Sequence, residues 1–231
     1  MTYADLFFDL DHTLWDFEAN SKNVLEVLFL QHKLVDHVNV DFNKFYQSYS
    51  YHNKRLWDRY HHGFILQEDL KWKRMWHTLL EFKLGDEKLA KELSAKYLDL
   101  LPQQKELFPY TIEILEYLVT KNYKLHLITN GFQKTQIAKI TNAGIAKYFI
   151  EVITSESANS LKPKKEIFEY AVSKCATQCC NSIMLGDNLD ADIMGAMNAG
   201  MDTVFVNHLN EETLLKPTYT VHHLKELEDI F

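Results

Sequence analysis

The sequence predicts an α/β protein in which a parallel β-sheet carries helices on both faces and a separate helical domain is inserted into the chain. Short apolar runs alternate with amphipathic helical segments over residues 1–15 and 101–231. Residues 16–100, in contrast, contain no convincing strand, and their apolar residues recur at helical spacing. We therefore expect a sheet domain, residues 1–15 and 101–231, and a helical domain, residues 16–100.

Five short apolar runs are the predicted strands, at residues 6–8, 125–128, 152–153, 183–185 and 203–206. Their alternation with helices is typical of a parallel sheet, because parallel neighbours need a crossover connection between them. Open sheets of this kind bind ligands at the carboxyl ends of their strands. The residues that follow these runs are therefore the first candidates for a functional site.

The predicted helical domain is electrically neutral and rich in aromatic residues. Residues 16–99 contain 13 Lys or Arg and 13 Asp or Glu, so the acidic excess of the chain, a formal charge of −7, lies in the sheet domain. A small helical domain needs bulky side chains to make a core. We therefore interpret Trp57, Trp72 and Trp76 as core residues rather than as substrate contacts.

Composition argues against several classes of protein. The 231 residues are 46% hydrophobic and 25% charged, which is typical of a globular chain. The net negative charge and the lack of a Lys/Arg run argue against nucleic acid as a partner. The chain shows no signal-peptide pattern and no run of about eighteen apolar residues, so we expect a cytoplasmic protein without a membrane partner. Cys175, Cys179 and Cys180 are too few and too close together for a disulfide framework.

Two aspartates, Asp9 and Asp11, follow the first predicted strand. Period-2 alternation would point both side chains to one side, where two close carboxylates repel each other unless a cation such as magnesium relieves them. One carboxylate can attack phosphorus, and the second can protonate the departing oxygen and later activate water. The alternative is an acidic pair that only caps the following turn.

Two further segments offer groups that can bind a phosphate. Thr129, Asn130 and Gly131 follow the second predicted strand and precede a helix, whose first backbone N–H groups can bind an anion. The same triplet also suits a simple turn or helix cap. Lys162, which Pro163 keeps out of helical geometry, can place its ammonium in the site, although a lone lysine is otherwise a surface residue.

The fourth segment has three acids within six residues, which is costly without a metal. Asp187 lies nearest the end of the predicted strand and is the expected metal ligand. Asp190 and Asp192 can instead stabilise the start of the next helix, an effect of about 0.3–1 kcal/mol each. The sequence does not decide which of these two is the second acid of the site.

Together these segments resemble the four motifs of the haloacid dehalogenase-like hydrolase superfamily, in its order and over the whole chain. The motifs are Asp9-x-Asp11-x-Thr13, the apolar run ending in Thr129-Asn130-Gly131, Lys162-Pro163, and Gly186-Asp187-x-x-x-x-Asp192. The resemblance implies a Rossmann-like core with an inserted helical cap domain that selects the substrate. It also implies a magnesium-dependent phosphatase that works through an aspartyl-phosphate intermediate on a small-molecule phosphate monoester.

The resemblance assigns roles to individual residues. Asp9 would be the nucleophile and Asp11 the general acid/base. Magnesium would be held by Asp9, Asp187 and the backbone carbonyl of Asp11. The other implied residues bind phosphate or support the site: Thr129, Asn130 and Lys162 for phosphate, with Asp192 and Asn188 in support.

Finer features resemble one branch of the superfamily, the YjjG-type pyrimidine 5′-nucleotidases. They are Thr129-Asn130-Gly131-Phe132, Leu56-Trp57-x-x-Tyr60-x-x-Gly63 and Ser155-Glu156. This branch implies hydrolysis of nucleoside 5′-monophosphates. A sugar-phosphate phosphatase or phosphoglucomutase of the same superfamily, and a phosphorylatable non-enzymatic signalling module, stay open as alternatives. A dehalogenase is not expected, because true dehalogenases lack an acid at the position of Asp11. The sequence does not indicate the oligomeric state.

Two positions depart from the pattern of the superfamily. Many relatives have glycine where His12 stands, and the loop before Lys162 usually carries glycine where this chain has Asn159. Asparagine is the next most tolerant residue of positive φ, so we expect the turn at Asn159 to survive.

Overall fold

The computed structural model of the chain describes residues 3–231 and contains two compact units. The first, called the sheet unit here, is Met1–Phe17 with Lys105–Phe231, and the second, the helical unit, is Glu18–Gln104. These boundaries lie two and four residues beyond those expected from the sequence, after residues 15 and 100.

The sheet unit contains one six-stranded sheet with strand order β3-β2-β1-β4-β5-β6, and all neighbouring strands run parallel. The strands are β1 (Asp5–Phe8), β2 (Lys124–Thr129), β3 (Phe149–Thr154), β4 (Ser182–Gly186), β5 (Asp202–Val206) and β6 (Tyr219–Val221). This confirms the predicted parallel α/β fold. All five predicted strands form, but β6 was not predicted, because its three residues include two exposed ones and make no apolar run.

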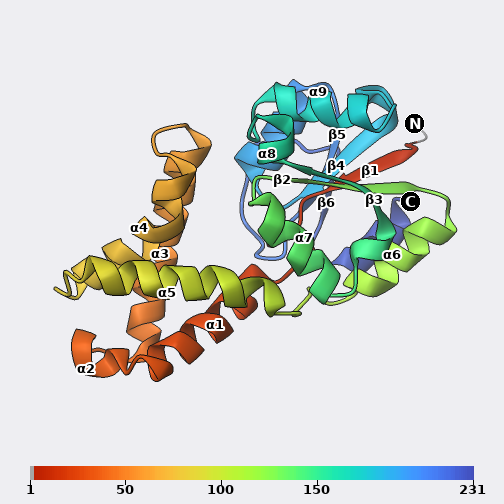
Figure 1. Ribbon diagram of the computed structural model, residues 1–231. Helices are drawn as coiled ribbons and strands as arrows, with labels where there is room; N and C mark the ends of the chain where they lie inside the picture. Colours follow the sequence, from red (N-terminus) through yellow and green to blue (C-terminus); the bar gives the residue numbers. More distant parts are fainter. Residues whose placement is uncertain (1–2) are drawn as a thin grey trace. The chain divides into compact units, whose positions relative to one another are not determined.

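Helices cover both faces of this sheet, as Figure 1 shows. The helices α6 (Thr111–Thr120) and α7 (Gln133–Asn142) lie on one side, and α9 (Lys165–Lys174) lies on the other. Two short helices, α8 (Ser155–Ala158) and α10 (Gly195–Asn198), complete the unit. One part of the core lies between the sheet and α9, where Phe7, Ile128, Met184 and Phe168 are fully buried. This packing holds the carboxyl ends of the central strands in fixed positions.

The helical unit contains helices and no strand among its described residues, as predicted. Its helices are α1 (Phe17–Gln31), α2 (Leu34–Val38), α3 (Phe42–His61), α4 (Gln67–Glu81) and α5 (Glu87–Leu100). Asp41 and Asp86 cap α3 and α5 by accepting hydrogen bonds from backbone N–H groups three residues on. The helix α4 packs against both α3 and α5.

The core of the helical unit differs from the sequence expectation. The aromatic residues at its centre are Phe45, Tyr49 and Tyr97, and the rings of Tyr49 and Tyr97 lie 5.4 Å apart. The three tryptophans that were expected there are only half-buried. Their size predicted burial, but other residues, such as Phe45, Leu56 and Leu70, occupy the buried positions of α3 and α4.

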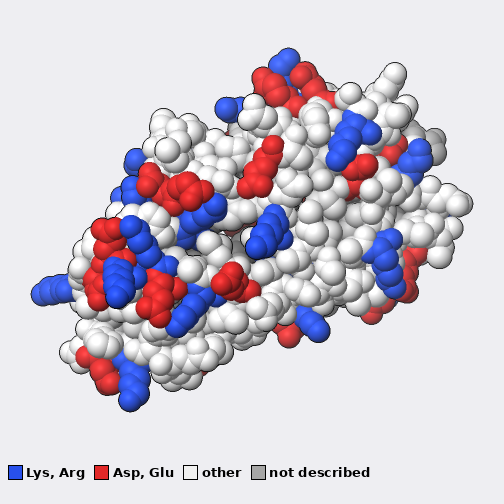
Figure 2. All heavy atoms as spheres, viewed as in Figure 1, with Lys and Arg blue, Asp and Glu red and all other residues white. Residues whose placement is uncertain are grey.

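Charges of both signs mix on the surface. On the face shown in Figure 2, Lys and Arg side chains lie among Asp and Glu side chains, and neither sign covers a continuous area. Within α5, Lys91 pairs with Glu87 and Lys96 with Glu92, one helical turn apart in each case. No helix within residues 3–231 is long and apolar enough to cross a membrane.

Candidate active site

Asp9 is the first residue after β1, at the point where the strand order reverses. β1 pairs with β2 on one side and with β4 on the other, and an open parallel sheet binds its ligands at such a point. The backbone N–H of Asp9 donates to the carbonyl of Leu185 (2.8 Å), which fixes Asp9 beside the end of β4. Its side chain is buried and accepts a hydrogen bond from Lys162.

Lys162 is buried and links two of the acids. Its ammonium donates to Asp9 Oδ1 (2.6 Å), to Asp192 Oδ1 (2.6 Å) and to the carbonyl of Ile128 (2.8 Å). These contacts use all three N–H groups of the ammonium. Burial by itself would lower the pKa of Lys162, but Asp192 and Asp9 reverse this effect and raise that pKa. Lys162 therefore stays charged in spite of its burial.

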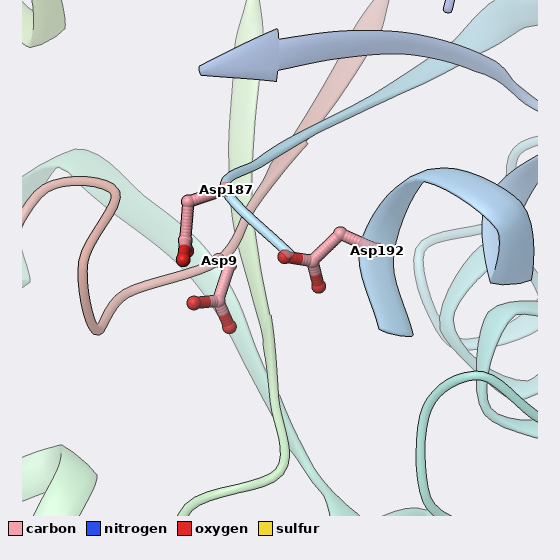
Figure 3. A group of neighbouring side chains, drawn as sticks. All are labelled: Asp9, Asp187 and Asp192. Atoms are coloured by element: carbon pink, nitrogen blue, oxygen red, sulfur yellow. The ribbon is translucent and has the colours of Figure 1, made fainter. Parts of the chain in front are cut away.

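Three carboxylates converge at this place, as Figure 3 shows, and two of them accept hydrogen bonds from Lys162. Oxygen atoms of Asp9, Asp187 and Asp192 all lie within 4.8 Å of one another. Asp9 and Asp187 come from the ends of β1 and β4, and Asp192 comes from the π-helical turn Leu189–Met194. Thr13 is buried and donates its hydroxyl to Asp187 Oδ1 (2.9 Å), which orients that carboxylate.

Asp192 and Asp190 differ in burial and in hydrogen bonding. Asp192 is 1% exposed, and its second oxygen accepts the backbone N–H of Asn188 (3.1 Å), while Asp190 is half-buried. Gly186 packs against the carboxyl group of Asp192 so closely that any Cβ there would clash with it. The side chain of Asn188 accepts the backbone N–H groups of Asp190 and Ala191, so Asn188 caps the turn that holds Asp192.

The charges in this cluster are unbalanced. Three carboxylates against the single ammonium of Lys162 leave two negative charges uncompensated when all are ionised. Burial, with further repulsion from Asp192, raises the pKa of Asp187 to about 8. Burial also raises the pKa of Asp9, and Asp192 and Asp187 add to this while Lys162 opposes it. A divalent cation would remove this penalty, and an all-oxygen set of donors suits a hard cation.

Asp9 and Asp187 fit the role of metal ligands better than Asp192 does. Both oxygens of Asp192 already accept hydrogen bonds, from Lys162 and from Asn188. Asp187 accepts one hydrogen bond at Oδ1, from Thr13. The cluster can therefore hold a divalent metal through Asp9 and Asp187, with Asp192 holding Lys162 in place.

Asp11 has different partners from Asp9. Its Oδ1 accepts from Lys139 Nζ (2.5 Å) and its Oδ2 accepts from Gln136 Nε2 (2.9 Å), both on α7. The alternation used to orient Asp9 and Asp11 together ends with β1 at Phe8, so it does not extend to Asp11. The Asp11 side chain is 23% exposed, more than that of Asp9.

Thr129 and Asn130, at the end of β2, contact the rest of the site in two ways. Thr129 Oγ1 accepts from the backbone N–H of Gly131 (3.1 Å) and from Gln136 Nε2 (2.7 Å). Nδ2 of Asn130 donates to the backbone carbonyl of Lys162 (2.9 Å), and Oδ1 of Asn130 accepts from the backbone N–H of Lys162 (2.8 Å). Because both polar atoms of the Asn130 side chain are engaged in this way, Asn130 positions Lys162.

Sequence reasoning assigned no role to Thr13, Gln136 or Lys139. Thr13 was inside the first motif, and its spacing from Asp9 and Asp11 was the available signal. Gln136 and Lys139 lie one turn apart on α7, on the side of the helix that also buries Ile140. The available signal was therefore a pair of polar residues on a partly apolar helix face. That pattern is weak, because most such residues lie at the edge of a buried face.

The two positions that depart from the superfamily pattern have positive φ. His12 has φ 64° and Asn159 has φ 48°. Asn159 ends α8 in the left-handed conformation, which confirms that the turn survives without glycine. The loop before Lys162 therefore keeps its shape.

Comparisons with known proteins place this chain in a family. The model of the haloacid dehalogenase-like hydrolase family matches residues 6–200. Pyrimidine 5′-nucleotidase PynA of Streptococcus pneumoniae is 32% identical over 99% of this chain and 95% of its own length. Pyrimidine 5′-nucleotidase YjjG of Escherichia coli is 31% identical over 100% of this chain and 98% of its own length.

A solved structure shows the same architecture. The crystal structure of YfnB from Bacillus subtilis bound to magnesium, which reveals interdomain movement, superimposes with a TM-score of 0.90 at 27% identity. The match covers 100% of this chain and 99% of YfnB. The matched family model, the full-length relatives and the order of the motifs agree with one another, and the chain belongs to the haloacid dehalogenase-like hydrolase family.

Proposed function

We propose that this enzyme is a magnesium-dependent phosphatase that hydrolyses nucleoside 5′-monophosphates through an aspartyl-phosphate on Asp9. The observation that carries the proposal is the convergence of Asp9, Asp187 and Lys162 at the reversal of strand order. A nucleophile, an unbalanced acidic pair and a fixed cation are the groups that phosphoryl transfer requires.

In the first step, the carboxylate of Asp9 attacks phosphorus and the P–O bond to the nucleoside breaks. Lys162 already binds Oδ1 of Asp9, so we assign the attack to Oδ2. Asp11 gives its proton to the departing 5′-oxygen and becomes a carboxylate. In the second step, Asp11 takes a proton from water, whose oxygen attacks phosphorus, and Asp9 is released with inorganic phosphate.

The other residues stabilise charge on the transferring phosphoryl group. Lys162 offers the fixed ammonium, and a phosphate oxygen would take over one of its three N–H groups. Thr129 offers its hydroxyl, which Gly131 and Gln136 hold by donating to its oxygen. Magnesium, held by Asp9, Asp187 and the backbone carbonyl of Asp11, would offset the negative charge of the carboxylates and the phosphate.

The names of the relatives support the substrate. PynA and YjjG are both pyrimidine 5′-nucleotidases and match this chain over nearly its full length. We propose the same substrate class here, with the helical unit acting as the cap that selects it. The sugar-phosphate alternative shares the chemistry of the sheet unit, so only substrate preference separates the two.

A screen of phosphate release tests the proposal. Purified protein with magnesium is given pyrimidine and purine nucleoside 5′-monophosphates and hexose phosphates, and inorganic phosphate is measured. We expect the highest kcat/KM on pyrimidine nucleotides. Preference for hexose phosphates would favour the sugar-phosphate phosphatase, and their isomerisation without phosphate release would favour a mutase. A stable phosphoprotein without turnover would favour a signalling module.

A further inference from the structure

We propose that Lys139 is a positioning residue for Asp11 and, with Gln136, holds that carboxylate for proton transfer to the leaving group. The inference rests on the proposed phosphatase function and extends it to a helix outside the four motifs. Lys139 acts through Asp11 rather than on the substrate. Its removal should therefore lower kcat/KM mainly for those substrates whose leaving group needs a proton.

The geometry gives each oxygen of Asp11 its own donor. Lys139 donates to Oδ1 and Gln136 to Oδ2, and both donors come from α7 at a spacing of three residues. Residues three apart lie on the same face of a helix, so α7 presents the two donors together. With one donor on each oxygen, the plane of the carboxylate is fixed.

Lys139 occupies an unusual position for a lysine on an amphipathic helix. It is 2% exposed, and its ammonium lies 4.3 Å from the centre of the Trp15 ring and 5.6 Å from that of Phe17. A buried ammonium is strongly unfavourable unless a negative group and hydrogen bonds compensate it. The fully buried Trp15 ring and the Asp11 carboxylate together hold the ammonium in one place.

Gln136 extends this arrangement to the phosphate-binding residue Thr129. Its single Nε2 group donates to Asp11 Oδ2 (2.9 Å) and to Thr129 Oγ1 (2.7 Å). Its Oε1 is buried and has no hydrogen-bond partner among residues 3–231. An unsatisfied buried acceptor is unfavourable. The Gln136 amide thus keeps Nε2 toward Asp11, although its Oε1 is then without a partner among residues 3–231.

This arrangement leaves room for further hydrogen bonds at Asp11. Each carboxylate oxygen has two acceptor positions, and within residues 3–231 one hydrogen bond is made to each oxygen. The side chain is also partly exposed. The two donors therefore fix the direction of the carboxylate and leave an acceptor position on each oxygen for a leaving group or a water molecule.

The test compares two substrates in the same protein preparation. A nucleoside 5′-monophosphate has an alcohol leaving group that needs protonation, whereas p-nitrophenyl phosphate has a leaving group that departs as a stable anion. The value of kcat/KM reports the steps up to departure of the leaving group. We expect Lys139→Met to lower kcat/KM on the nucleotide at least about tenfold, and on p-nitrophenyl phosphate much less. The ratio of the two values does not depend on the folded fraction.

Two variants serve as controls. Lys139→Arg keeps a cation at this position and should restore most of the ratio. Lys134→Met removes an exposed lysine from the same helix and should leave the ratio unchanged. Equal losses on both substrates with Lys139→Met would overturn the inference, because they would indicate a structural role.

A double variant tests whether Lys139 acts through Asp11. In the Asp11→Asn background, Lys139→Met should cause no further loss on the nucleotide, since the group that it positions is already inactive. An additional loss of the same size as in the wild type would contradict the inference. If the wild-type protein hydrolyses neither substrate, the proposed function itself fails, which is a distinct outcome.

Discussion

Two polar clusters of the sheet unit differ in their composition. Beyond the carboxyl ends of β1 and β4 lie Asp9, Asp187 and Asp192, with Lys162 as the ammonium that bonds to two of them. Nearer the amino ends of β1 and β2 lie Asp5, His126 and Cys175. The first cluster collects like charges, whereas the second has a single acid.

The second cluster has a hydrogen-bond partner for each polar group of its histidine. His126 Nε2 lies 2.9 Å from Asp5 Oδ1, and its Nδ1 lies 3.3 Å from the sulfur of Cys175. Because Nε2–H donates to the carboxylate, Nδ1 is the acceptor for the thiol of Cys175. Burial lowers the pKa of His126, although Asp5 opposes this, and burial raises the pKa of Cys175 to about 11. In this cluster the thiol of Cys175 and the imidazole of His126 are thus neutral, and Asp5 is the single acid.

The difference shows how burial of charge separates a site from a structural contact. A Cys-His-Asp arrangement suggests a nucleophile by its residue types, yet the raised pKa of Cys175 keeps its sulfur protonated and unreactive. The acids of the first cluster repel one another, and the ammonium of Lys162 balances only one of their three charges, so a further cation is needed. Uncompensated charge, rather than the presence of polar residues, therefore indicates where a ligand binds.

The largest expected effect distinguishes two aspartates of the same strand region. Asp9→Asn should lower kcat/KM by about 10⁴-fold or more, since it removes the nucleophile. The melting temperature should change little, because an asparagine oxygen can still accept from Lys162. Asp5→Asn is the matched control and should keep its activity. Wild-type activity in Asp9→Asn, or loss of activity in Asp5→Asn without unfolding, would remove the distinction.

Most of the fold could be predicted because parallel strands buried on both faces are continuous apolar runs. The edge strand β6 could not, since it has three residues, of which two are exposed, and forms no apolar run. In the site, the rule that ligands lie beyond strand ends identified Asp9 and Asp187 as candidates. The burial of Lys162 could not be predicted, because its partners are distant in sequence. Lys139 was missed for the same reason, since only tertiary packing turns its helix face toward Asp11.

Magnesium should stabilise the protein through the first cluster only. A ligand present at 100 times its Kd adds about 2.7 kcal/mol to the free energy of unfolding. We expect thermal unfolding with magnesium, compared with EDTA, to show an increase in Tm that Asp187→Asn abolishes. Asp190→Asn should retain the increase, because Asp190 is outside the cluster. An undiminished shift in Asp187→Asn would mean that the metal binds elsewhere.

The pH dependence of stability without metal should also depend on Asp187. Its pKa is raised from 3.8 to about 8, so between these values the folded protein holds a proton that the unfolded chain has lost. Stability should therefore fall as pH rises through this window, by at most about 1.4 kcal/mol per pH unit.

This effect is measured as a difference between two proteins. The Tm of the wild type in EDTA should fall more steeply from pH 5 to pH 8 than that of Asp187→Asn. Buried histidines such as His126, whose pKa is lowered, act in the opposite direction but contribute equally to both proteins. Parallel pH profiles for the two proteins would contradict the raised pKa of Asp187.

The smallest expected effect concerns the second cluster. Cys175→Ala removes the donor to His126 Nδ1 and should lower the free energy of unfolding by about 1 kcal/mol, or Tm by about 2–4 °C, with phosphatase activity unchanged. Cys175→Ser keeps a donor at this place and should recover part of the loss. Thermal unfolding and kcat/KM measured on the same preparations check both statements. A fall in kcat/KM of Cys175→Ala at unchanged Tm would show that the second cluster takes part in function, and the contrast between the clusters would then no longer hold.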